Sequence, residues 1–141
     1  MILTSIHNES DFTIKNDSIN QLINIIFSSN NILSGKINII IISDDNLRKM
    51  KKEYFNQDLY TDVIAFKIEE NPIEAEIYIS HDRVKDNSKK YNQSFHQEFK
   101  RVVIHGTLHL CGYNDSTKNE KLEMRSMENN YLSKFKDKVL V

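Results

Sequence analysis

The sequence predicts an α+β fold, a single-domain α/β sandwich in which helices pack a small mixed β-sheet. Segments with apolar residues at helical spacing alternate with short β-branched runs along the 141 residues. A chain of this length corresponds to about one domain. Only one proline and three glycines interrupt it, and it contains no repeat or linker, so we expect residues 1–141 to form one domain.

The N-terminal third is expected to contain two strands and a helix. Residues 1–6 are typical of an edge strand. Residues 11–27 carry isoleucine and leucine at helical spacing, which predicts a helix that ends before Ser34 and Gly35. Residues 36–42 are β-branched and nearly all apolar, which predicts a buried strand.

The middle of the chain is expected to form a short helix and a hairpin. Ser43 is a suitable N-cap for a helix over residues 46–55. Residues 61–68 and 74–80 have the composition of strands, and the turn at Asn71-Pro72 between them indicates a hairpin.

The C-terminal part is expected to be helical over residues 80–91, 94–111 and 118–135. The second of these helices is apolar along one face. Gly112 follows it directly, and glycine is the residue best suited to the left-handed backbone that ends many helices. The last helix is charged and amphipathic.

The composition argues against several classes of protein. With one cysteine the chain has no internal disulfide, and Cys111 inside an apolar run is typical of a reduced cytosolic thiol. The longest run of large apolar residues is the four isoleucines of residues 39–42, far short of the ~20 that span a bilayer. The first residues lack the features of a signal peptide. We therefore expect a cytoplasmic protein with no membrane partner.

The formal net charge of −1 argues neither for nor against nucleic acid, but the charge is unevenly distributed. Residues 83–101 contain six basic and two acidic side chains, a balance of +4, whereas residues 44–76 contain nine acidic and five basic side chains, a balance of −4. The positive segment is either a surface for an RNA backbone or a solvated helix face.

Two histidines lie four residues apart in the helix expected over residues 94–111. Positions i and i+4 share one face of a helix, so His105 and His109 can reach one metal ion together. A chain that turns at Gly112 can bring Asp115 to the same point. Three protein ligands with one open position are typical of catalytic zinc sites, where the ion lowers the pKa of water. The spacing alone also fits two histidines that are simply hydrogen-bonded to their neighbours.

Two residues near these histidines, Gly106 and Arg101, restrict the kinds of reaction that we expect at the site. Zinc peptidases of the H-E-x-x-H class place a glutamate base after the first histidine, whereas Gly106 cannot take a proton. Glycine within a helix costs up to ~1 kcal/mol relative to alanine, so we expect Gly106 to pack closely against a strand. Arg101 lies one turn before His105, where it either binds a phosphate oxygen or forms an ion pair, for instance with Glu98 or Asp82.

The stretch HGTLHLCGYND, residues 105–115, resembles the signature of the YbeY family of bacterial endoribonucleases, H-G-x-L-H-L-x-G-Y-D-H, at seven of nine specified positions. The differences are Asn114 in place of aspartate and Asp115 in place of the third histidine ligand. The segment YFNQDLYTDVIAF is similar to the family's Y-R-G-x-D-x-P-T-D-V-L-S-F, with Phe55 in place of the arginine. The resemblance covers roughly residues 44–132.

This resemblance implies a metal-dependent, single-strand-specific endoribonuclease of rRNA processing, notably 3′-end maturation of small-subunit 16S rRNA, and of ribosome quality control. It implies that His105, His109 and Asp115 hold one zinc ion or another divalent metal; we expect Arg101 to contact the phosphate. The implied partners are ribosomal RNA, the small ribosomal subunit and ribosome-associated proteins. We expect Arg101 and the basic run of residues 85–90 to replace the charge missing at Phe55.

Two other functions stay open at this point. A non-catalytic, metal-stabilised ribosome-assembly factor fits the loss of the arginine at Phe55. A metal-dependent hydrolase of another class, such as a peptidase, fits the pair of histidines but lacks a base at Gly106.

Overall fold

The computed structural model describes all 141 residues. They form four strands and five helices with connecting loops. Their order is β1 (Ile2–Asn8), α1 (Asn16–Ser29), β2 (Gly35–Ile42), α2 (Asp44–Phe55), β3 (Val63–Glu70), β4 (Ile73–Ser80), α3 (His81–Lys90), α4 (Phe95–Leu110) and α5 (Lys118–Lys134). Every expected element is present, and most of their ends lie within two residues of the expected positions. None of the helices combines the length and apolar character that a membrane span requires.

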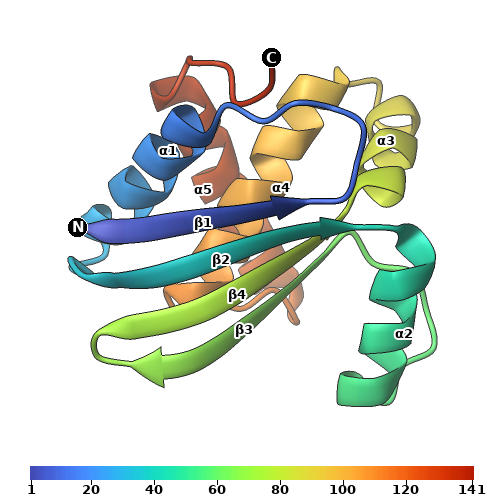
Figure 1. The fold of residues 1–141 in the computed structure, drawn as a ribbon, viewed down its shortest axis with the longest axis horizontal. Coiled ribbons are helices and arrows are strands. Elements are labelled where there is room, and N and C mark those ends of the chain that lie inside the picture. Colours follow the sequence, from blue (N-terminus) through green and yellow to red (C-terminus); the bar gives the residue numbers. More distant parts are fainter.

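The four strands form one mixed sheet in the order β1-β2-β4-β3, shown in Figure 1. Strands β1, β2 and β4 are parallel, whereas β3 runs antiparallel to β4 through the expected hairpin. The α+β class with a small mixed sheet is therefore confirmed, and β1 is an edge strand as expected.

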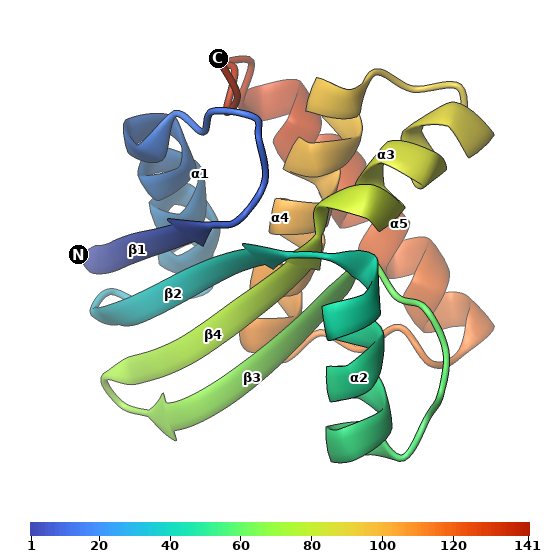
Figure 2. The same ribbon diagram turned by 45° about the vertical axis from the view of Figure 1, so that its right-hand side comes forward.

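Helices cover both faces of the sheet because successive side chains of a strand point to opposite sides. Ile39 and Ile41 of β2 join the main core of 26 buried residues, which includes side chains of α1, α4 and α5. Ile42 instead packs with Leu47 of α2 and Ile64 of β3 in a small separate cluster. Figure 2 shows α2 beside β3 and β4.

Helix α4 is the central helix, since it contacts β3, β4, α1, α3 and α5. Gly106 permits its close approach to the sheet. A Cβ atom at this position would lie 3.0 Å from Ile77 Cγ2 and 3.1 Å from Val63 Cγ2. The expected packing of Gly106 against a strand is confirmed, and this contact sets the depth at which α4 holds the two histidines.

The first helix begins at Asn16, five residues later than the apolar spacing predicted. The residues just before it pair with the C-terminal segment instead. The Lys15 amide donates to the Val139 carbonyl at 2.8 Å, and Ile14 forms an antiparallel bridge with Leu140. A helix over this stretch would direct the same backbone groups elsewhere, so tertiary pairing overrides the local pattern here.

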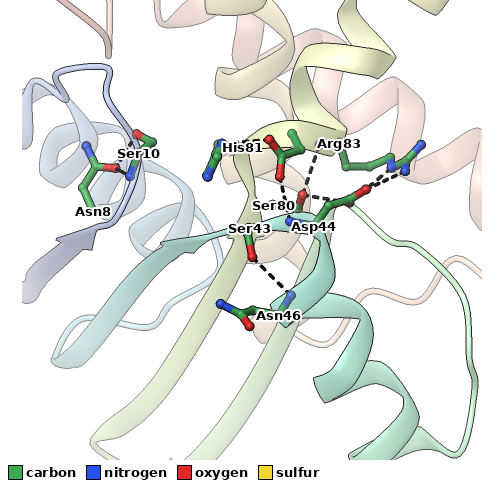
Figure 3. Close-up of polar contacts among 9 residues, drawn as sticks. Asn8, Ser10, Ser43, Asp44, Asn46, Ser80, His81 and Arg83 are labelled. Carbon is green, nitrogen blue, oxygen red and sulfur yellow. Dashed lines mark hydrogen bonds and ion pairs between the residues drawn. The ribbon is translucent and has the colours of Figure 1, made fainter.

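Asp44, the first residue of α2, joins α2 to α3 at the carboxyl ends of β2 and β4 (Figure 3). Its carboxylate accepts hydrogen bonds from Arg83 Nη2 at 2.7 Å and Ser80 Oγ at 3.0 Å, and its amide donates to Asp82 at 2.9 Å. Ser43 and Ser80 also cap the two helices. These contacts fix the start of the segment that leads through α2 toward β3.

The loop between α2 and β3 is held by a second set of contacts. The Tyr60 ring lies 4.8 Å from Arg48 Cζ and 4.7 Å from Arg83 Cζ, so two guanidinium groups pack on it. At the end of the loop the Asp62 carbonyl accepts a hydrogen bond from the Ser80 amide at 2.9 Å. The loop therefore delivers Asp62 to a defined position next to α4.

Candidate metal centre

The side chains of His105, His109 and Asp115 converge on one point. His105 Nε2 lies 3.0 Å from His109 Nε2 and 3.1 Å from Asp115 Oδ2, and His109 Nε2 lies 3.5 Å from the same oxygen. Ligand atoms at the usual zinc distances of about 2.0–2.1 Å are about 3.3 Å apart in a tetrahedron. The three donor atoms thus have the spacing of one face of a zinc tetrahedron.

The end of α4 brings Asp115 to the two histidines. The helix ends at Leu110, and Gly112 follows with a φ of +102°, in the left-handed region that favours glycine. The Tyr113 hydroxyl then donates to Asn30 Oδ1 at 2.8 Å and ties the turn to the end of α1. The predicted reversal at Gly112 is confirmed, and it places the carboxylate of Asp115 beside the imidazoles.

Glu128 of α5 orients the first histidine. Its Oε2 lies 2.6 Å from His105 Nδ1, and its Oε1 accepts a hydrogen bond from Arg101 Nη1 at 3.0 Å. Burial alone would raise the pKa of Glu128, but the hydrogen bonds and charges of His105 and Arg101 outweigh it and hold that pKa below its usual value. An ionised Glu128 keeps a proton on Nδ1, which leaves Nε2 of His105 as the donor atom toward a metal.

The surroundings of His105 favour positive charge. Burial lowers its pKa, but the hydrogen bond and charge of Glu128, together with Asp62 and Asp115, raise the pKa above its usual value overall. A divalent cation among the three donor atoms satisfies the same negative field. The electrostatics and the spacing of the donor atoms therefore both fit a metal ion.

Arg101 lies on the same side of α4, but its guanidinium is engaged with α5. Nη1 donates to Glu128 and Nη2 donates to Asn129 Oδ1 at 2.9 Å, and the side chain is 12% exposed. Its ion-pair partner is thus Glu128, and neither Glu98 nor Asp82. Residue spacing within one helix could not predict this partner, because the contact depends on how α5 packs on α4. Its contact with a phosphate stays a prediction.

Two cavities adjoin the candidate metal centre and share three lining residues. One of about 380 Å³ lies between α3, α4 and α5, and the other of about 520 Å³ lies between α2, β3 and α4. Asp62, His105 and Asp115 line both cavities. The two cavities therefore lie next to each other, on either side of these residues.

Sequence reasoning missed Glu128 and Asp62 as site residues. Burial raises the pKa of Asp62 against the opposing charge of His105, and Asn87 Nδ2 donates to its carboxylate at 3.4 Å. Asp62 falls in the segment that resembles the YbeY pattern, which offered a signal for it. Glu128 had none, since it is one of several acidic residues in a charged helix.

The basic run of residues 85–90 contributes little to these cavities. Of residues 81–91, only Asn87 of α3 and Tyr91, which follows α3, line the smaller cavity. The cation next to Phe55 is Lys51, whose Nζ lies 4.7 Å from the centre of the Phe55 ring. Cys111 is a poor metal ligand as expected, because burial raises the pKa of its thiol to about 12.

Comparison with known proteins agrees with this arrangement. The family model described as "Endoribonuclease YbeY" matches residues 5–136. A curated "Endoribonuclease YbeY" of Flavobacterium psychrophilum is 39% identical over 136 residues, which cover 94% of this chain and 96% of that protein. A protein of the same name from Amoebophilus asiaticus is 48% identical over 98 residues, 68% of this chain and 67% of the relative.

A solved structure is similar in fold. The solution structure of a Thermotoga maritima protein matches with a TM-score of 0.64 and covers 95% of this chain and 92% of its own. The two sequences are 24% identical, so this match supports the arrangement of strands and helices and no more.

Proposed function

The chain belongs to the YbeY endoribonuclease family, and from this membership we propose that it is a metal-dependent endoribonuclease that cleaves single-stranded RNA. The observation that carries the proposal is the group formed by His105, His109 and Asp115, whose donor atoms all lie within 4.8 Å of one another. We propose that residues 1–141 act as one YbeY-like domain in the cytoplasm.

Zinc is the metal that we propose for this site. Two imidazoles and a carboxylate with an open fourth position form a common catalytic zinc set, although the same donors also suit iron or manganese. When bound, such an ion acts as a Lewis acid and lowers the pKa of water toward neutrality.

The residues of the chain have separate roles around this ion. His105, His109 and Asp115 hold it, and Glu128 fixes the tautomer and the ring orientation of His105. Arg101 supports Glu128 through its hydrogen bond at 3.0 Å. Because Arg101 also lines the smaller cavity, we propose that it contacts the phosphate as well.

The cations of the smaller cavity support RNA as the substrate. Lys121 and Arg125 of α5 line it together with Arg101, and the acidic lining residues are Asp62, Glu98, Asp115 and Glu128. Basic side chains along a groove hold a nucleic-acid backbone through contacts that do not depend on sequence. We propose that the backbone runs past these cations, so binding is expected to weaken steeply as salt increases.

Within RNA, we propose ribosomal RNA as the biological substrate, with the 3′ end of small-subunit 16S rRNA as the site of maturation. The small ribosomal subunit and ribosome-associated proteins are the proposed partners, and ribosome quality control is part of the proposed role. The support comes from family membership and from the resemblance of residues 105–115 to the family signature.

The test compares single-stranded RNA with its own duplex, using zinc-loaded protein before and after removal of the metal by a chelator. We expect cleavage of the single strand, little cleavage of the duplex, loss of activity with the chelator and its return with added zinc. Absence of cleavage together with ribosome binding that survives loss of the metal ligands would instead support a non-catalytic assembly factor. Hydrolysis of an unstructured peptide library would support a peptidase.

A further inference from the structure

The larger cavity carries an aromatic side chain close to the candidate metal centre. Phe55, at the end of α2, is 43% exposed and lines the same cavity of about 520 Å³ as His109 and Asp115. Its ring stacks on Phe66 of β3, with ring centres 5.6 Å apart and planes inclined by 23°. Phe55 therefore has a fixed support on one side while much of its surface stays open to solvent.

A positive charge accompanies this ring. Lys51 lies one turn before Phe55 on α2, lines the same cavity and places Nζ 4.7 Å from the centre of the Phe55 ring. Lysine carries its charge on a flexible four-carbon stem, so the ammonium can move to a phosphate and leave the ring surface to another group. The cavity thus combines an aromatic platform and a mobile cation.

This combination is the one with which proteins hold unpaired nucleotides. A base stacks on the aromatic ring, and a nearby cation binds the backbone. A base within a duplex is paired and covered by its neighbours, whereas an unpaired base can turn out to meet an aromatic side chain. All three proposed metal ligands, His105, His109 and Asp115, also line this cavity.

We propose that Phe55 and Lys51 form a subsite for one unpaired nucleotide beside the scissile phosphodiester, with the base stacked on Phe55 and a phosphate bound by Lys51. The inference rests on the proposed endoribonuclease function and deepens it, because it gives a physical reason for single-strand specificity. Every base has a flat face, so the subsite requires a base without selecting its identity.

The experiment uses short single-stranded RNAs, each lacking the base at a different position, and zinc-loaded wild type, Phe55→Ala and Phe55→Trp. Tyr54→Ala is the matched control, because Tyr54 is 61% exposed and touches Phe66 but does not line the cavity. On intact RNA we expect Phe55→Ala to lower kcat/KM by roughly 5- to 100-fold, with Phe55→Trp and Tyr54→Ala close to wild type.

The RNAs that lack one base identify stacking itself. One missing base should lower wild-type kcat/KM by a factor similar to Phe55→Ala, and the same RNA should be cleaved equally slowly by both proteins. The proposal would be overturned if Phe55→Ala cleaved intact RNA at the wild-type rate. It would also be overturned if removal of that base lowered kcat/KM by the same factor in Phe55→Ala as in wild type. Thermal unfolding of each variant checks that it is folded.

The proposed phosphate contact of Lys51 is tested through the salt dependence of RNA binding, measured by fluorescence anisotropy. Lys51→Ala should make the negative slope of log K against log salt less steep by about 0.7. Lys49 is exposed on the same helix and lies outside the cavity, so Lys49→Ala should leave the slope unchanged. If wild type cleaves none of the RNAs, the endoribonuclease function fails. RNA affinity measured by anisotropy then tests the subsite. The proposed subsite is contradicted if Phe55→Ala binds intact RNA as tightly as wild type does.

Discussion

His105 Nδ1 lies 2.6 Å from Glu128 Oε2, so a buried carboxylate on α5 orients a histidine on α4. The two residues lie 23 positions apart in the sequence, and their contact ties the candidate metal centre to the packing of α5 on α4. Carboxylates in this position fix the ring and increase the basicity of the metal-binding nitrogen.

Glu128→Gln is expected to weaken zinc binding by about 10- to 100-fold, since the amide cannot hold the proton on His105 Nδ1 as the carboxylate does. Zinc affinity is measured by competition with a chromophoric chelator. Glu123→Gln, on the exposed face of the same helix, is the control and should bind zinc as wild type does. Equal affinities for Glu128→Gln and wild type would show that Glu128 plays no part in metal binding.

The contact between Asp44 and Arg83 is expected to couple α2 to α3. The two side chains are 16% and 27% exposed and lie 2.7 Å apart, so solvent screens them only in part. A double-mutant cycle with alanine, measured by denaturant unfolding, should give a coupling free energy of about 1–2 kcal/mol. The solvent-exposed pair Lys67 and Glu70 should give about 0.5 kcal/mol or less, and a similar value for both pairs would contradict the account.

Gly106→Val is expected to lower the free energy of unfolding by about 1–3 kcal/mol. Valine adds methyl groups beyond a Cβ atom that already would lie 3.0 Å from Ile77 Cγ2. Ser126→Val on the exposed face of α5 is the control for helix propensity and should cost under about 1 kcal/mol. Equal losses in both variants would mean that α4 does not need a glycine to approach the sheet.

Glu98 is expected to make stability depend on pH. Burial raises its pKa, and the charge of Asp62 raises it further, against Arg101 and Arg125. The folded protein therefore keeps this proton to higher pH than the unfolded chain does, and stability falls as pH rises above the unfolded value of 4.5. Glu98→Gln removes this loss.

Denaturant unfolding at about pH 4 and about pH 7.5 checks this prediction. Relative to wild type, Glu98→Gln should gain stability between the lower and the higher pH. Glu123→Gln, which replaces an exposed carboxylate of α5, should show no such gain. A constant difference between Glu98→Gln and wild type at both values would contradict the raised pKa.

Local patterns were sufficient to predict the elements and all three proposed metal ligands. Helical spacing places His105 and His109 on one face, and Gly112 marks the turn that returns Asp115. These features depend on backbone geometry over a few residues, which the order of residue types largely determines. Even the close packing of Gly106 followed from the cost of glycine within a helix.

Contacts between distant segments could not be predicted in the same way. Glu128 and Asn129 reach Arg101 only because α5 packs beside α4. Helix α1 begins at Asn16, later than predicted, because the residues before Asn16 pair with the C-terminal segment. The sequence alone does not assign Lys51 to the charge absent at Phe55, since the place of Lys51 in the cavity depends on how α2 lies against β3.

The most direct test of the central claim measures bound zinc and cleavage of precursor small-subunit rRNA for wild type, His109→Ala and His96→Ala. His96 is exposed on α4 and serves as a matched control. The account predicts that wild type and His96→Ala bind one zinc ion and cleave the RNA, whereas His109→Ala loses both properties. Cleavage by His109→Ala at the wild-type rate would contradict a catalytic metal held by His105, His109 and Asp115.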